Sequence, residues 1–98
     1  MRTRLLPASE PDAEPFCRLT PEEGRRRQAG TDRLFARLRD QHQAGNVQEY
    51  FFAGDPDQLW QDLTLFVDEE AQCCPFFTFE QIERSDGVTL RVSGKAIG

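Results

Sequence analysis

The 98-residue chain is predicted to form a single small α+β domain, with its helices packed on one face of a three-stranded antiparallel sheet. Two segments begin with a helix-capping residue followed by proline, at Thr20-Pro21 and at Asp55-Pro56. Near the C-terminus, Val88, Leu90 and Val92 alternate with other residues, as in a strand with one buried face. An apolar fraction of 38%, which includes eight phenylalanines, is enough for a modest core. These signals predict the order α-β-α-β-β.

The first fifteen residues carry little structural signal. They are rich in Pro, Ala, Ser and acidic residues and show no periodicity. We therefore expect residues 1–15 to form a flexible, disordered tail and residues 16–98 to form the domain.

A helix is expected to begin at Thr20, because Pro21 suits the first helical position and Glu23 completes a capping box. Its apolar residues, Leu34, Phe35 and Leu38, lie in its second half. We expect this helix to run to about Gln43 and to stop before Gly45-Asn46.

The second helix is expected to open at Asp55-Pro56 and to end near Cys73, since Pro75 cannot continue it. At helical spacing its apolar residues share one face. Strands are expected at 47–53, 76–84 and 88–93, with a hairpin turn between the last two.

The net charge of −5 and the pI of about 4.8 disfavour nucleic acid as the main partner. The charge is divided unevenly, because residues 18–39 hold seven arginines against three acids, whereas residues 40–83 hold ten acids and no Lys or Arg. A basic helix packed across an acidic remainder explains this pattern, and so does an anionic partner or a dimer. No apolar run reaches the roughly 18 residues that cross a bilayer. The N-terminus does not resemble a signal peptide, so we expect no membrane partner, a cytoplasmic location and cysteines present as thiols.

The most informative segment lies at the end of the second helix. Glu70 falls in the middle of the apolar face, within one turn of Cys73 and Cys74. A carboxylate there must be desolvated, protonated or paired, and each costs free energy. We therefore consider three roles for Glu70: a metal ligand or base beside Cys74, a partner of an arginine on the first helix, or a residue that reaches solvent at the edge of the sheet. Two thiolates with a third donor suit a soft ion such as Hg(II), Cu(I), As(III) or Zn(II). The alternative is that both cysteines are small core residues.

Cys17 is the third thiol, three residues before the capping Thr20. It would approach Cys73 and Cys74 if the first helix packs beside the second. His42 is the only histidine and is expected at the surface. The sequence has no phosphate-binding glycine loop, nucleophile elbow or dinucleotide fingerprint, so we expect neither an enzyme nor an organic cofactor.

Two short motifs resemble those of a group of small, uncharacterised bacterial proteins. That group shares a C-x-L-T segment opening a helix and an E-x-x-C-C-P-F segment further on, which are here residues 17–20 and 70–76. Such proteins accompany metal-responsive regulators, including those of mercury resistance. The resemblance implies that Cys17, Cys73 and Cys74 belong to one three-thiol site.

The leading hypothesis is a non-enzymatic cytoplasmic protein that binds a soft heavy metal or metalloid through Cys17, Cys73 and Cys74, with Glu70 adjacent. Its role would be accessory to metal resistance or sensing. The alternative is an interaction module that forms a homodimer or docks on a regulator protein, with cysteines in its core. Thiol redox chemistry is disfavoured, because the acidic residues 68–70 oppose formation of a thiolate.

Overall fold

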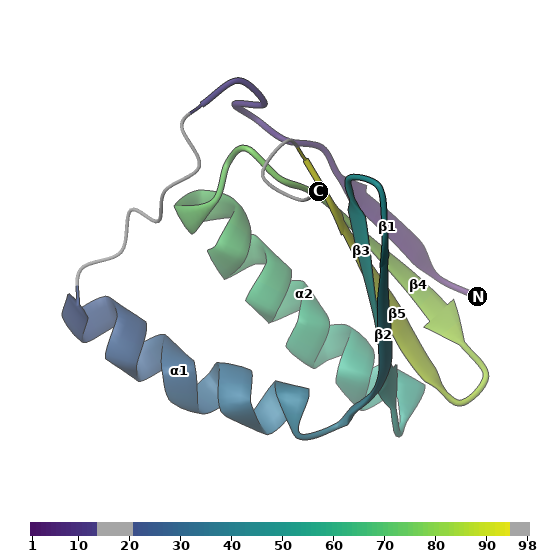
Figure 1. Cartoon of the computed structure of the whole chain (residues 1–98). Helices are drawn as coiled ribbons and strands as arrows, with labels where there is room; N and C mark the ends of the chain where they lie inside the picture. The colour runs from purple at the N-terminus through teal and green to yellow at the C-terminus, as the bar shows by residue number, and fades with distance from the viewer. Residues whose placement is uncertain (14–20, 95–98) are drawn as a thin grey trace.

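The computed structural model describes residues 1–13 and 21–94 and shows a five-stranded antiparallel sheet with two helices on one of its faces (Figure 1). The elements follow the order β-α-β-β-α-β-β, and the strands are arranged β1-β4-β5-β3-β2 across the sheet. Their bounds are β1 (Thr3–Leu6), α1 (Pro21–Phe35), β2 (Leu38–Ala44), β3 (Val47–Ala53), α2 (Pro56–Cys73), β4 (Thr78–Arg84) and β5 (Gly87–Ser93).

The prediction of a three-stranded sheet in the order α-β-α-β-β is wrong, because the sheet gains β1 and β2. The first helix ends at Phe35 instead of Gln43, and its expected last third is strand β2. A two-residue loop, Gly45-Asn46, joins β2 to β3, and Gly45 has a φ of 60°. Glycine with positive φ at the first loop position favours a tight hairpin. The backbone N–H and C=O groups of β2 then form hydrogen bonds with β3, whereas in a longer helix they would have bonded within the helix.

The expected disordered tail is also wrong at Thr3–Leu6, which pairs antiparallel with β4. Ion pairs hold this strand in place. Arg2 Nη2 lies 3.1 Å from Glu83 Oε2, and Arg4 donates to Asp68 on α2. The sheet therefore begins before residue 16, where the domain was expected to start. Strand β1 has only two apolar residues. Backbone pairing with β4 and ion pairs with residues distant in sequence hold it in the sheet.

The remaining elements are confirmed. Strand β3 and helix α2 have the expected bounds, and β4 and β5 form the expected hairpin, although β4 begins at Thr78 instead of Phe76. In the described ranges, no helix is long and apolar enough to cross a membrane. The core lies between the helices and the sheet and consists of Leu34, Phe52, Leu59, Leu63, Val67, Phe79, Val88, Leu90 and Val92.

Candidate functional site

Helix α2 ends at Cys73, and the chain turns at Cys74 and Pro75. The Cys74 N–H donates to the Glu70 carbonyl at 2.6 Å, and Cys74 has φ −122° and ψ 68°, outside helical values. Proline lacks an N–H and disfavours helical geometry in the preceding residue, so the helix cannot continue. The two cysteines on either side of this bend differ in burial. Cys73 is buried in the protein, with 3% exposed, and Cys74 is half-buried.

The two sulfurs are in different chemical states. Cys73 is disulfide-bonded, and Cys74 is a free thiol. The expectation that the cysteines are thiols is therefore wrong for Cys73. Cys17, the third expected ligand, lies outside the described residues.

Glu70 joins the free thiol to helix α1. The Cys74 thiol donates to Glu70 Oε2 at 3.8 Å, and Arg27 of α1 donates to Glu70 Oε1. Arg27 Nε also lies 3.0 Å from Glu69 Oε2. Among the three roles considered for Glu70, the structure shows pairing with an arginine of the first helix. Sequence reasoning did not single out Arg27, because seven arginines between residues 18 and 39 looked alike; only the packing of α1 on α2 distinguishes it.

The surroundings of Cys74 keep its sulfur protonated. Burial first, and then the negative charge of Glu70 and the hydrogen bond to it, raise the pKa of the Cys74 thiol to about 11. The Arg27 charge acts in the opposite direction and is outweighed. A thiol with so high a pKa is a poor nucleophile at neutral pH. A soft metal ion binding here would have to displace the proton.

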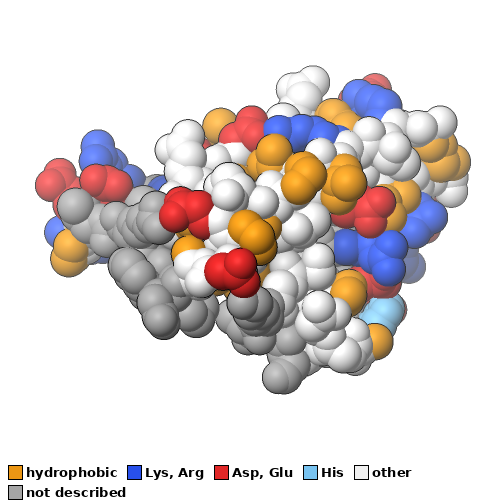
Figure 2. Space-filling view, turned by 90° about the horizontal axis from the view of Figure 1, so that it is seen from above, with side chains coloured by type: hydrophobic (Ala, Val, Ile, Leu, Met, Phe, Trp, Pro, Cys, Tyr) orange, Lys and Arg blue, Asp and Glu red, His pale blue; other side chains and the backbone are white. Residues whose placement is uncertain are grey.

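The packing of α1 on α2 also accounts for part of the uneven charge. Arg27 pairs with the α2 carboxylates, and Arg37 Nη2 lies 2.7 Å from Asp62 Oδ2. On the described part of the face seen in Figure 2, acidic, basic and apolar side chains are interspersed. An internal role thus explains Arg27 of α1 and Arg37, which lies two residues beyond the end of α1, and leaves others, including Arg26 and Arg33, without one.

The expected ligands are not assembled in the described part of the chain. Among residues 1–13 and 21–94, no three His, Cys, Asp or Glu side chains form a group that could hold a metal ion. His42 lies on β2, largely exposed, with its Nε2 3.1 Å from Glu49 Oε1. Of the expected ligands in the described ranges, the structure brings together the Cys74 thiol and Glu70, at one end of α2.

Comparisons of the chain with protein-family models, with curated proteins and with solved structures give no match. The function must therefore be argued from the site itself.

Proposed function

We propose that this protein binds one soft metal or metalloid ion through reduced cysteine sulfurs at the C-terminal end of α2, in a reducing compartment such as the cytoplasm. The observation that supports it is the contact of the free Cys74 thiol with Glu70, directly after a second cysteine in the chain. Hg(II), Cu(I), As(III) and Zn(II) all accept thiolate ligands. The motif resemblance adds Cys17 as the third sulfur donor and favours a role accessory to metal resistance or sensing.

The disulfide of Cys73 makes this activity depend on reduction. A dithiol reductant would supply two electrons and two protons, break the sulfur–sulfur bond and become a disulfide itself. The Cys73 thiol would then stand next to Cys74. Each sulfur that ligates the metal releases one proton. Glu70 Oε2, which accepts the hydrogen bond of the Cys74 thiol, can accept its proton.

Native mass spectrometry tests this proposal. The protein is reduced with dithiothreitol and desalted without oxygen. Separate samples are then mixed with one equivalent of Hg(II), Cu(I), As(III) or Zn(II). We expect one bound ion in the reduced protein only, with an affinity that rises with pH because protons are released. Cys74→Ser should weaken binding at least tenfold, while the circular dichroism spectrum is unchanged.

Glu69→Gln is the matched control, because Glu69 pairs with Arg27, whereas the Cys74 thiol donates to Glu70. It should bind the ion like the wild type. Absence of any adduct in the reduced protein would refute the proposal, as would a Cys74→Ser variant that binds the ion with the affinity of the wild type.

A second candidate function is self-association through the sheet face opposite the helices. Four ionisable side chains form a row across β2, β3, β5 and β4 on this face. His42 lies 3.1 Å from Glu49, Arg91 lies 2.7 Å from Glu49, and Arg91 lies 3.3 Å from Glu80. The neighbouring residues Leu90 and Val92 point into the core, so Arg91 points away from the helices. Figure 1 shows both helices on the other side of the sheet.

The row is complementary to itself. A twofold axis parallel to the strands and between β3 and β5 would place Glu49 of one copy over Arg91 of the other. His42, when protonated, would face Glu80. An axis across the strands would instead place each charge over itself. Opposite charges across an interface favour pairing in one orientation.

Sedimentation equilibrium tests this candidate. Arg91→Glu should abolish a dimer, because it places like charges opposite each other within and between copies. The double variant Glu49→Arg with Arg91→Glu should restore it, and Arg25→Glu on α1 should leave it intact. A monomer at all concentrations, or a dimer insensitive to Arg91→Glu, would contradict the candidate.

A further inference from the structure

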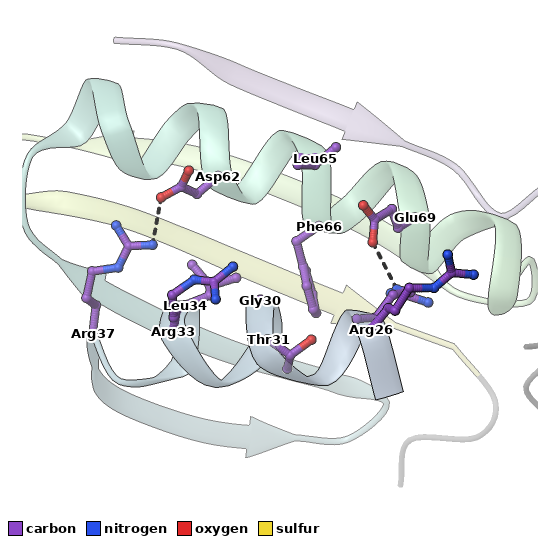
Figure 3. A pocket seen from close by; sticks show the side chains of 11 residues that line it. Arg26, Gly30, Thr31, Arg33, Leu34, Arg37, Asp62, Leu65, Phe66 and Glu69 are labelled. Carbon is purple, nitrogen blue, oxygen red and sulfur yellow. Dashed lines mark hydrogen bonds and ion pairs between the residues drawn. The ribbon is translucent and has the colours of Figure 1, made fainter. Parts of the chain in front are cut away.

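A groove of about 390 Å³ lies between α1 and α2, and neither Cys73 nor Cys74 is among the described residues that line it (Figure 3). Side chains from both helices line it. Leu34 and Phe66 provide apolar surface, and Leu65 on its rim is 63% exposed although it is a large apolar residue. Exposed leucine beside a concave surface is typical of a binding site, since burying it from water is favourable.

The groove exists because α1 has small residues where it crosses α2. Gly30 and Thr31 line the groove at the middle of the helix. Glycine inside a helix costs about 1 kcal/mol relative to alanine. A Cβ atom at Gly30 would contact only Arg33 Nη2, at 3.8 Å, so no packing constraint excludes a side chain there. The missing side chain leaves open space over which the Arg33 guanidinium lies.

The groove also carries positive charge that the protein itself does not neutralise. Four arginines line it. Arg27 and Arg37 are paired with carboxylates of α2. Arg26 and Arg33 have no hydrogen-bond or ion-pair partner in the part of the chain that the structure describes. Seven residues apart, they lie on the same side of α1, about 10 Å from each other along the helix axis.

We propose that this groove binds a small organic anion with an apolar body. The apolar part would pack against Leu65 and Phe66, and a carboxylate, sulfonate or phosphate group would accept hydrogen bonds from Arg33 and Arg26. Guanidinium groups bind such anions in a bidentate manner. The volume is within the range of small-molecule sites. The charge identifies the ligand as anionic, and the exposed leucine identifies it as partly apolar.

Titration of the full-length protein with anilinonaphthalene sulfonate, followed by its fluorescence, tests the proposal. Arg33→Gln and Arg26→Gln should each weaken binding several-fold, and Arg25→Gln, outside the groove, should not. Gly30→Leu fills the groove and should weaken binding at least tenfold. Gly24→Leu is the matched control, since a Cβ at Gly24 meets nothing within 4 Å.

Both leucine variants should be at least as stable as the wild type, because they remove a helical glycine. Weaker binding by Gly30→Leu alone would therefore not reflect unfolding. Equal binding of the uncharged phenylnaphthylamine would overturn the proposal, because the arginines would then play no part. Equal affinity for inorganic phosphate would overturn it as well, because no apolar body would be needed. Self-association that Arg33→Gln abolishes, without binding of the probe, would assign the groove to a second copy of the chain.

Discussion

Replacing Gly87 with alanine is expected to lower the free energy of unfolding by about 3 kcal/mol. Gly87 pairs with Ala53 of β3 and with Arg84 of β4, so backbone lies on both sides of it. A Cβ atom there would stand 1.9 Å from the Phe52 carbonyl oxygen. That atom belongs to the backbone of a central strand, so no side-chain rotation relieves the overlap and the strands must separate. Urea unfolding measures the effect.

Gly24→Ala is the matched control for Gly87→Ala. Gly24 lies in α1 with nothing within 4 Å of a Cβ atom, so this change should raise the free energy of unfolding by up to about 1 kcal/mol. A Gly87→Ala protein as stable as the wild type would show that β3 and β5 do not approach each other as described.

The second large effect concerns the reactivity of Cys74. Because burial and Glu70 raise its pKa to about 11, its thiolate fraction near neutral pH should be roughly 100-fold below that of an ordinary cysteine. The alkylation rate of Cys74 should therefore keep rising with pH until about 11, where an unperturbed thiol levels off near 9. Iodoacetamide labelling, followed by peptide mass analysis, gives this profile for Cys74 alone.

Glu70→Gln should shift the profile of Cys74 to lower pH, because it removes the negative charge and leaves Arg27 free to stabilise the thiolate. Glu69→Gln should leave the profile unchanged. If the alkylation rate of Cys74 in the wild type levelled off near pH 9, its thiol would be exposed to solvent and the raised pKa would be wrong.

The same pKa shift links pH to stability. The thiolate is disfavoured in the folded protein, so the raised pKa contributes stability below about pH 9 that is lost as the pH rises toward 11. Cys74→Ser should remove this part of the alkaline pH dependence.

The elements that were predicted correctly are those with local signals. Helix α2 begins at Pro56, after Asp55, although the Asp55 side chain makes no capping hydrogen bond. Its apolar residues at helical spacing are the buried ones, Leu59, Leu63 and Val67. Strand β5 alternates because one face lies on the core. Periodicity and a proline at the first helical position are readable without knowledge of the partner.

The elements that were missed are edge strands. In β2 only Leu38 is partly buried and the other six residues are exposed, so the segment has no alternating apolar signal. The Gly45-Asn46 pair fits a helix stop, and two such residues between paired segments equally indicate a hairpin. Strand β1 has no apolar periodicity that could be recognised in the sequence. The charged contacts that hold it, with Glu83 and Asp68, are to residues far away in the chain.

The sequence by itself determined the α+β class, the second helix with its thiols and carboxylate at one end, and the C-terminal hairpin, since each depends on residues close together in the chain. The tertiary structure alone decided which arginine pairs with Glu70, that Cys73 is disulfide-bonded while Cys74 keeps its proton, and that Arg26 and Arg33 face an open groove. These properties depend on distances between atoms from different elements, and on burial, which sets the strength of every charge interaction. The order of residues along the chain gives neither these distances nor the burial of each side chain.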